Sequence, residues 1–463
     1  MIHKEQQLDY VSDPSIYFER LRGKPWPIWL DSGHMAGTRY DILVANPYKT
    51  LVTRGKETTI TENQNITTSE HSPLELLAEA LQINEKIGIS LPFSGGAVGY
   101  FGYDLDLTGY QEEETIVEPQ SLPEIPDMAV GLYNWAVIFD HLEKRVSLTG
   151  LFDEDESDIE VRWENLLQLM TQPNKYCIDP PFILNEAFEE SLSYDQYQEA
   201  FATIQHYLQE GDCYQVNLTQ RFSAPCHDDL WRLYREIRRG NPAPYGAYMQ
   251  LDGVEVLSFS PEQFLKVKQR QVTTSPIKGT RPRSADPVQD QQALSELQQS
   301  EKDRAENLMI VDLLRNDLGR CCRIGSIQVP RLFFTESHPN VHHLISTITA
   351  ELADGMSAID LLNDCFPGGS ITGAPKIRAM EIIKEVEPVP RNIYCGAIGY
   401  IGFDGSMETN IAIRTAYRHN GELSFHAGGG IIADSNVEAE YRELFDKAGF
   451  FLNHFANPEN SRE

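Results

Sequence analysis

The stretch YDQYQEAFATIQHYLQEGDCYQVNLTQRF, residues 194–222, places a helical pattern directly before a strand pattern. Its first part carries apolar side chains at steps of three and four, the spacing of one helical face: Tyr197, Phe201, Ile204, Tyr207 and Leu208. This spacing predicts an amphipathic helix over Tyr194–Glu210 that ends at Gly211. Apolar and polar residues then alternate over Cys213–Phe222, which predicts a strand.

Two further helices are expected downstream of this stretch. One is predicted from about Asp290 to Leu318, and another from Val437 to about Phe455. Ser435, with Glu438 three residues later, has the pattern of a capping box at the start of the last helix. Long helices in a strand-bearing chain, without a regular alternation of strand and helix, favour the α+β class.

The chain divides into two regions that differ in their pattern of apolar and turn residues. Residues 1–180 carry short apolar runs between turn residues, which predicts a part rich in strands. An acidic, proline-containing connection over residues 153–181 ends this part. We therefore expect an N-terminal region over 1–180 and a C-terminal region over 190–455.

Composition excludes several classes of protein. The chain has 463 residues, with 69 Asp and Glu against 39 Lys and Arg and a formal charge of -30. A polyanion such as nucleic acid would be repelled, and the sequence contains no concentrated basic patch. No apolar run reaches the roughly 18 to 20 residues of a membrane helix, and the start lacks the apolar core of a signal peptide. We expect a cytoplasmic protein with reduced thiols, because its 7 cysteines are scattered without metal-ligand spacing.

Lys278 is the first candidate for chemistry. It stands between an extended Ser-Pro-Ile segment and Gly279, which allows close approach of the backbone. A lysine nucleophile must be neutral, so its pKa must fall by about three units through burial or like-charge repulsion. Arg281 and Arg283 are candidates for that repulsion. A surface charge in a glycine-rich turn is the alternative that the segment alone leaves open.

Carboxylates supply the second candidate. Glu306 lies inside the apolar-striped second helix, and Glu440 and Glu443 are three residues apart on the last helix, so they share a face. Carboxylates that converge from separate helices are a usual way to hold Mg2+. A solvated acidic face is the alternative.

Glycine-rich segments are the third candidate. Gly428–Gly430 either turn bare backbone N–H groups toward an anion or form a tight bend between strands. Residues 368–376 have the glycine spacing of a phosphate loop, but Ala374 and Pro375 stand where Lys and Ser or Thr are required, which excludes a P-loop NTPase.

Two further polar positions interrupt apolar sequence. Arg414 lies in an apolar strand, where a buried guanidinium needs a carboxylate partner, and that partner could be a substrate. His342 and His343 have no Ser or Cys nucleophile motif nearby and are interpreted as core or supporting histidines.

Taken together, these segments resemble the chorismate-utilising enzymes, which include the large subunits of anthranilate synthase and aminodeoxychorismate synthase. The resemblance spans nearly the whole chain and rests on Gly211–Leu218, Ser260–Phe264, Thr274–Arg283, Ala305–Asp312, Cys365–Met380, Ile411–Thr415, Gly428–Gly430 and Glu438–Lys447. It implies an α+β fold of two sheets packed face to face and flanked by helices, with the two regions interwoven in one unit.

Two positions indicate the branch of the family. Where anthranilate synthases have a motif like Pro-Ile-Ala-Gly-Thr, this chain has Lys278 in place of the Ala. In this respect the chain resembles the aminodeoxychorismate synthases, which have a Lys at this position. The related isochorismate and salicylate synthases activate water with a Lys where this chain has Gln215, so Gln215 favours ammonia as the nucleophile. An anthranilate synthase large subunit, which would release pyruvate, remains the alternative.

The resemblance implies a role for each candidate. Mg2+ on Glu306 and Glu443, assisted by Glu440, would bind the ring carboxylate of chorismate. Glu262 would be the general acid and Lys278 the covalent nucleophile. The expected substrate-binding residues are Gln215, Gly279, Thr280, His343, Thr372, Tyr394, Arg414, Gly428, Gly429, Gly430 and Lys447. Lys376 is a weaker candidate for binding a carboxylate.

The resemblance also implies two partners. None of the cysteines lies in a glutaminase nucleophile motif, so ammonia would come from a separate glutamine amidotransferase subunit in a heterodimer. A bound tryptophan is expected in a pocket formed by Ser32, Gly37, Thr38, Arg39, Tyr40, Pro244, Tyr245 and Gly246. A catalytically silent, tryptophan-binding subunit is disfavoured because the catalytic candidates are all retained.

Overall fold

Two antiparallel sheets form the framework of the protein. The computed structural model describes residues 1–35, 38–88, 90–105, 124–154, 158–173, 180–338 and 341–456. In spatial order, the first sheet contains β1 (Ile2–Leu8), β10 (Arg145–Phe152), β9 (Trp135–Asp140), β3 (Tyr40–Val44), β2 (Ile28–Asp31), β13 (Tyr245–Leu251), β14 (Val254–Ser260), β23 (Thr415–His419), β24 (Glu422–Ile431), β12 (Gln215–Pro225) and β11 (Glu189–Glu190), with β20 (Gly373–Ala374) beside β12.

The second sheet is built in the same way. It contains β17 (Ile277–Pro282), β19 (Val341–Glu351), β16 (Gln271–Ser275), β15 (Gln263–Lys268), β22 (Met407–Ile411), β21 (Ala397–Gly402), β7 (Gly96–Phe101), β8 (Met128–Tyr133), β4 (Lys49–Arg54), β5 (Glu57–Glu62) and β6 (Asn65–Ser69), with β18 (Gln328–Ser337) beside β19.

The two sheets pack face to face over a dry core. Ile42, Ile138 and Met249 of the first sheet share one buried cluster with Val98 and Tyr400 of the second. These strands are buried along nearly their whole length because one face meets the other sheet and the opposite face is covered by helices and loops. The predicted face-to-face arrangement of two sheets is confirmed.

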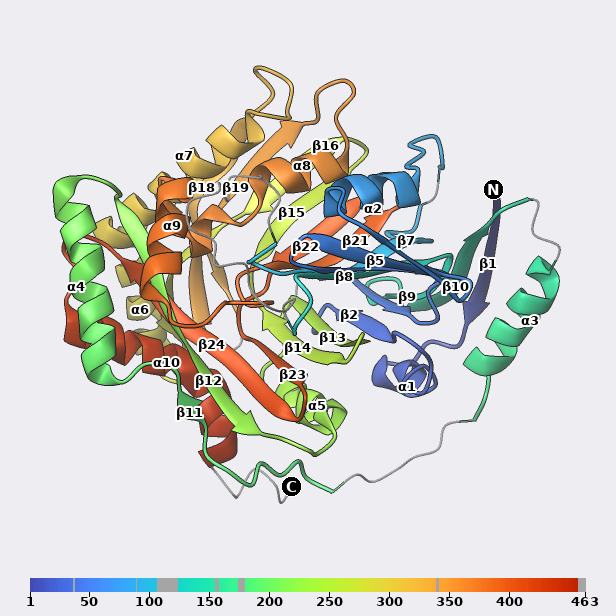
Figure 1. The fold of residues 1–463 in the computed structure, drawn as a ribbon, viewed down its shortest axis with the longest axis horizontal. Coiled ribbons are helices and arrows are strands. Elements are labelled where there is room, and N and C mark those ends of the chain that lie inside the picture. The colour runs from blue at the N-terminus through green and yellow to red at the C-terminus, as the bar shows by residue number, and fades with distance from the viewer. Residues whose placement is uncertain are drawn as a thin grey trace.

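Helices cover the outer faces of the sheets. They are α1 (Ser15–Phe18), α2 (Pro73–Leu81), α3 (Ile159–Met170), α4 (Tyr194–Glu210), α5 (Leu230–Gly240), α6 (Pro287–Gln299), α7 (Glu301–Leu318), α8 (Ala358–Cys365), α9 (Lys376–Val386) and α10 (Val437–Ala456), with the 3-10 turn η1 (Gly369–Ile371). Figure 1 shows α4, α9 and α10 grouped beside β12 and β24, while α7 lies beside β18 and β19. Across the described ranges, every helix is too short or too polar to span a bilayer.

The helix predicted over Tyr194–Glu210 is confirmed as α4. Ser193 and Gln196 form a reciprocal capping box at its start, and Gly211 ends it with a φ of 83°. The strand that follows is β12, which begins at Gln215 rather than at Cys213.

The single helix predicted from Asp290 to Leu318 is wrong. The helix is interrupted at Ser300, whose extended backbone ends α6. The Ser300 side chain accepts a hydrogen bond from Asp303 N and so caps the start of α7. Because the apolar periodicity continues across Ser300, the sequence pattern did not reveal that this residue caps a second helix.

The last helix, α10, is confirmed, but its predicted cap is not. Asn436 Oδ1, not Ser435, accepts from the N–H of Ala439, at 3.1 Å. The Ser435 hydroxyl instead donates to Glu440 Oε1 at 2.7 Å. The capping residue is therefore Asn436, one residue after the predicted Ser435, whose hydroxyl binds the Glu440 carboxylate instead.

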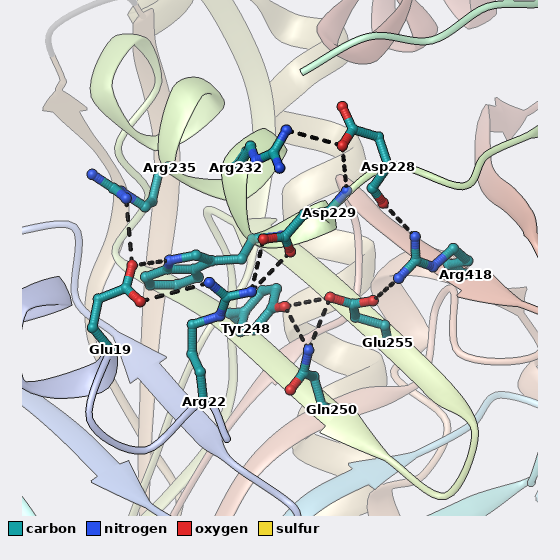
Figure 2. A network of polar contacts seen from close by, with 11 residues as sticks. Glu19, Arg22, Asp228, Asp229, Arg232, Arg235, Tyr248, Gln250, Glu255 and Arg418 are labelled. Atoms are coloured by element: carbon teal, nitrogen blue, oxygen red, sulfur yellow. Dashed lines mark hydrogen bonds and ion pairs between the residues drawn. The ribbon is translucent and has the colours of Figure 1, made fainter. Parts of the chain in front are cut away.

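Each sheet contains one continuous block of strands from before residue 180 and one from after residue 188, and the two blocks meet at the β2–β13 pair in the first sheet and at the β7–β21 pair in the second. A charged network fastens the early chain to α5 and the strands beneath it, as Figure 2 shows: Arg22 donates to both carboxylate oxygens of Asp229, at 2.9 and 2.8 Å. Glu255 accepts from both Tyr248 and Arg418 in the same view. The boundary between the two predicted regions stays a prediction.

Candidate active site

Ser370 in η1 joins the two predicted catalytic residues. Its hydroxyl donates to Glu262 Oε1 at 2.9 Å, and its carbonyl oxygen accepts from Lys278 Nζ at 3.0 Å. Glu262 lies in the junction between β14 and β15, whereas Lys278 lies in β17. Three segments distant in sequence therefore meet at one carboxylate and one amine.

The backbone around Glu262 is tied to the neighbouring strand. The Ile411 N–H donates to the Glu262 carbonyl at 3.1 Å, and the Ser260 hydroxyl donates to the Ile411 carbonyl at 2.6 Å. A cavity of about 10 Å³, room for roughly one water molecule, is lined by Glu262 and Ser370. A larger hollow of about 420 Å³ lies along the turn between β13 and β14, and none of the predicted site residues lines it.

Burial shifts the pKa values of the pair toward each other. Burial raises the pKa of Glu262, although the nearby Lys278 charge opposes that shift. Burial lowers the pKa of Lys278, against the opposing charges of Glu306 and Glu262. Both shifts favour the neutral forms that a proton donor and an amine nucleophile require.

The predicted role of two arginines beside Lys278 is wrong. Arg281 pairs with Asp303 at 2.9 Å, and Arg283 pairs with Asp290 at 2.8 Å. Their charges are therefore compensated locally, and desolvation is the main cause of the lowered pKa of Lys278. Gly279 has a φ of 89°, and a Cβ there would lie 2.9 Å from Asp303 Cγ, so a larger residue would be strained.

The three predicted metal carboxylates lie near this pair. Burial raises the pKa of Glu306 and of Glu440, and the charge of Glu443 adds to both shifts. The pKa of Glu443 is lowered although partial desolvation opposes this shift, because Lys447 lies 2.8 Å from its Oε1. The charges of the three carboxylates therefore act on one another.

The donor set fits a hard divalent cation in its chemistry. Carboxylate oxygens are the ligands that Mg2+ prefers, and Glu440 Oε2 and Glu443 Oε1 lie 3.5 and 3.6 Å from the position that a Cβ would take on Gly429. Within the described ranges, however, no three His, Cys, Asp or Glu side chains stand close enough together to hold a metal. The carboxylates would have to draw together around an ion.

The three glycines lie inside strand β24, so the alternative of a tight bend is wrong. They pair in register with β12, with Leu218 opposite Gly429. On the other side of β24, pairing with β23 ends at Phe425. Because an antiparallel strand points alternate N–H groups to each side, this edge leaves backbone donors directed away from β12.

Arg414 has the features of a ligand-binding residue. Its backbone φ is 48°, its guanidinium lies over the Phe450 ring at 5.4 Å, and desolvation lowers its pKa. Among the residues that the structure describes, none forms an ion pair with Arg414, and desolvation is the cause of its pKa shift. A buried guanidinium without a carboxylate is costly, so a carboxylate ligand would compensate it.

His343 lies between Arg414 and the Lys278 strand. Its Nδ1 is 2.9 Å from the Thr280 hydroxyl oxygen, and burial, reinforced by the Arg414 charge, lowers its pKa to about 3. A neutral His343 therefore supports the strand rather than carrying charge. Whether His343 also binds substrate, as the resemblance implies, stays a prediction.

The other predicted substrate residues differ in their freedom to bind. Gln215 is buried and donates to Asn217 at 3.2 Å, but its Oε1 has no partner among the described residues. The Thr372 hydroxyl donates to the Gly368 carbonyl at 2.8 Å. Tyr394 stacks on His426 with ring centroids 5.2 Å apart.

Lys376, the weaker carboxylate candidate, is occupied elsewhere. Its Nζ lies 2.6 Å from Asp317 Oδ2 and also donates to a backbone carbonyl.

Ser370 and Lys302 were missed by the sequence reasoning. Ser370 lies in the segment Cys365–Met380, from which only Thr372 and Lys376 were named as candidate site residues, because no local pattern shows that Ser370 contacts Glu262 and Lys278.

The predicted tryptophan residues cluster where β2, β3 and β13 are neighbours. Ser32 N donates to Asp41 Oδ1 at 2.9 Å, Arg39 pairs with Asp140 at 2.7 Å, and Gly246 is paired in register with Asp31. Thr38, Tyr40, Pro244 and Tyr245 flank these contacts in the chain, and Gly37 lies outside the described residues. A tryptophan site here stays a prediction.

Comparison with known proteins gives one family. The model of the chorismate binding enzymes matches residues 27–453. Aminodeoxychorismate synthase component 1 of Klebsiella aerogenes is 48% identical over 94% of this chain and 95% of the relative. The protein of that name from Escherichia coli is 46% identical over 94% of both chains.

More distant proteins share the fold. Anthranilate synthase component 1 of Pseudomonas aeruginosa is 39% identical over 80% of this chain and 77% of the relative. The crystal structure of anthranilate synthase component I from Streptococcus pneumoniae superposes with a TM-score of 0.79 at 31% identity, covering 89% of this chain and 92% of that one. The menaquinone-specific isochorismate synthase of Escherichia coli gives 0.74 at 17% identity over 98% and 94%, which is a likeness of fold alone.

Proposed function

Since the chain belongs to the family of chorismate-binding enzymes, we propose that it is the large subunit of an aminodeoxychorismate synthase. The reaction replaces the C4 hydroxyl of chorismate with an amino group from ammonia and releases water. The product keeps its enolpyruvyl group, and a separate lyase would aromatise it to para-aminobenzoate for folate. The similarity to proteins of that name, at 46 and 48% identity, supports this branch over the anthranilate synthases.

The observation that carries the proposal is the shared contact of Glu262 and Lys278 with Ser370. A single residue holds a carboxyl group with a raised pKa beside an amine with a lowered pKa. General acid catalysis and amine attack need these two groups in the same place and in their neutral forms. A surface lysine, the alternative for Lys278, would have neither the burial nor the carboxylate neighbours.

The two groups suit a double displacement. Protonated Glu262 would give its proton to the C4 hydroxyl, which leaves as water, while neutral Lys278 forms a bond to C2 and the ring double bonds shift toward C4. Ammonia would then bond to C4, the double bonds would shift back, and the bond from C2 to Lys278 would break to release the neutral amine. The excess proton on the new amino group returns to Glu262, so both residues are regenerated.

A bound Mg2+ would supply a Lewis acid at the ring carboxylate of chorismate, held by Glu306 and Glu443 with help from Glu440. Arg414 would bind a carboxylate of the substrate, which would compensate its buried charge. Lys447 and the N–H groups along Gly428–Gly430 would add donors at the same edge. The unpartnered Oε1 of Gln215 would accept a hydrogen bond from ammonia.

Ammonia would come from a second component. The name component 1 that the relatives carry implies such a partner. The six cysteines within the described residues are all buried, which does not suit an exposed glutaminase nucleophile. We therefore infer a glutamine amidotransferase subunit that forms a heterodimer with this chain.

A tryptophan bound near Ser32 belongs to the proposal. Equilibrium dialysis with radiolabelled tryptophan is expected to show binding that the Ser32→Ala variant weakens. Absence of binding by the wild-type chain would contradict this part and leave the catalytic part untouched.

Product analysis tests the function itself. The purified chain, incubated with chorismate, Mg2+ and ammonium, is expected to yield an amine that retains its enolpyruvyl group and gives para-aminobenzoate only when a lyase is added. Anthranilate with stoichiometric pyruvate would instead assign the alternative, an anthranilate synthase large subunit.

A further inference from the structure

Two lysines partly offset the negative charge of the acidic cluster of Glu306, Glu440 and Glu443. Lys447 lies one turn after Glu443 on α10, with its Nζ 2.8 Å from Glu443 Oε1 and 2.9 Å from the Gly428 carbonyl oxygen. Lys302 lies one turn before Glu306 on α7, with its Nζ 4.0 Å from Glu306 Oε1. The Lys302 charge also acts on Glu440 and Glu443 of the other helix.

The Lys447 ammonium contacts one of the carboxylate oxygens that a cation would need. Lys447 Nζ, Glu440 Oε2 and Glu443 Oε1 are 3.4, 3.5 and 3.6 Å from one point, the position of a Cβ on Gly429. A divalent ion with carboxylate ligands needs oxygens at about 2.0 to 2.6 Å. An ion bound to Glu443 Oε1 would therefore compete with the ammonium for that oxygen.

The net charge of the cluster determines how it binds a cation. Three carboxylates against two ammonium groups leave one negative charge at the cluster. A divalent cation alone would turn this into one positive charge, whereas the cation together with a dicarboxylate substrate would restore one negative charge. The two lysines therefore lower the affinity of the cluster for the cation alone, and they lower it less when the cation binds together with the substrate.

We propose that Lys302 and Lys447 are internal counter-ions of the acidic cluster, which weaken its binding of a divalent cation until the dianionic substrate is present. This inference rests on the proposed function, which supplies the cation and the substrate. By linkage, the substrate must raise the affinity for the cation by the same factor as the cation raises the affinity for the substrate.

Binding of Mn2+, measured by loss of the free-ion electron paramagnetic resonance signal, tests the inference without turnover. In ammonium-free buffer, Lys302→Met is expected to bind Mn2+ about threefold more tightly than the wild type, since an exposed charge is screened by solvent and salt. Lys447→Met should bind Mn2+ alone about tenfold more tightly, because this ammonium directly contacts a carboxylate. Chorismate should tighten Mn2+ binding to the wild type and do so less in Lys302→Met.

Two matched variants separate this effect from general changes in charge. Lys302→Arg keeps the positive charge and should bind Mn2+ as the wild type does. Arg315→Gln removes a positive charge from the same helix, where Arg315 pairs with Asp312 at 2.8 Å away from the cluster, and should also leave Mn2+ binding unchanged.

The outcomes distinguish the two proposals. If the wild type binds Mn2+ but Lys302→Met and Lys447→Met bind it equally or more weakly, the counter-ion inference is overturned while the proposed function stands. If the wild type binds no Mn2+ even with chorismate, the cation in the proposed function fails and the inference falls with it. Tighter binding in both variants, with reduced coupling to chorismate in Lys302→Met, supports the inference.

Discussion

Ser370 binds both members of the proposed catalytic pair, Glu262 through its hydroxyl and Lys278 through its carbonyl oxygen. The hydroxyl stabilises ionised Glu262 and so restrains the rise of its pKa that burial causes. The carbonyl oxygen accepts from Lys278 in either charge state of the amine. Ser370 is thus a positioning residue that also sets how easily Glu262 keeps its proton.

Ser370→Ala is expected to lower kcat about tenfold and to leave KM nearly unchanged, because one hydrogen bond is lost. Without the hydroxyl the pKa of Glu262 should rise further, so the limb of the pH–kcat profile that requires protonated Glu262 should move to higher pH. Ser370→Thr keeps a hydroxyl and should restore the limb. An unshifted limb in Ser370→Ala would refute the contact.

Glu262→Gln removes the proton donor while keeping the shape of the side chain. The rate of amine formation is expected to fall about 10²- to 10⁴-fold. Because the Glu262 charge raises the pKa of Lys278, its loss should lower that pKa further. The pH dependence of Lys278 acylation, followed by peptide mass spectrometry, should therefore shift to lower pH, and a shift to higher pH would contradict the coupling.

The resemblance supplied the candidate catalytic residues, which stay a prediction, and the sequence did not predict the physics of their environment. Arg281 and Arg283 are close to Lys278 in sequence, and repulsion by them was expected to lower its pKa. Acids from α6 and α7 neutralise both arginines, a contact between elements that no local pattern encodes. Burial by the packed sheets causes the shift instead.

At the scale of elements, strand β24 shows why glycines at the site are not equivalent. Gly428–Gly430 were ambiguous in sequence between an anion site and a bend, because glycine lacks the side chain that reports a face. Pairing with β12 resolves the ambiguity. A Cβ on Gly428 would lie 2.1 Å from the Leu218 carbonyl oxygen, whereas one on Gly429 would meet side-chain atoms no closer than 3.4 Å.

Two alanine substitutions on this strand should therefore differ. Gly428→Ala forces the strands apart and is expected to destabilise the protein by about 2 kcal/mol or more, seen as a lower Tm by circular dichroism. Gly429→Ala should leave the Tm within about a degree of the wild type, because its Cβ faces the mobile ends of side chains. Equal melting of the two variants would contradict the register.

At the scale of the whole molecule, the joining of early and late strands into shared sheets lay beyond what periodicity predicts. Apolar runs predicted strands before residue 180, but a period of two carries no information on which distant strand becomes a neighbour. The pairing of β2 with β13 and of β7 with β21 joins residues that are far apart in the chain. Only the resemblance to a known family predicted the face-to-face sheets.

This burial predicts a pH dependence of stability. Asp127, at the start of β8, accepts from Gly55 N at 2.7 Å, and burial raises its pKa to about 7 from 3.8. The folded state therefore holds this proton more tightly than the unfolded state, so the contribution of Asp127 to stability is greatest below about pH 4 and is lost as pH rises to about 7, a change of up to about 4 kcal/mol.

Asp127→Asn removes that titration and should be more stable than the wild type at pH 8, with a smaller loss between pH 4 and pH 7. Urea unfolding across this range measures the effect. Asp354→Asn is the matched control, since that side chain is almost fully exposed. A wild-type profile that Asp127→Asn does not change would refute the role of this carboxyl.

The position at which nitrogen enters the substrate tests the role of Lys278 itself. Wild-type protein and Lys278→Ala are incubated with chorismate, Mg2+ and 15N-ammonium, and the products are examined by nuclear magnetic resonance. We expect 15N bonded to C4 with the enolpyruvyl group intact in the wild type, and at least a hundredfold less of this product from Lys278→Ala. Nitrogen at C2 with release of pyruvate, or C4 amination by Lys278→Ala at the wild-type rate, would contradict the mechanism.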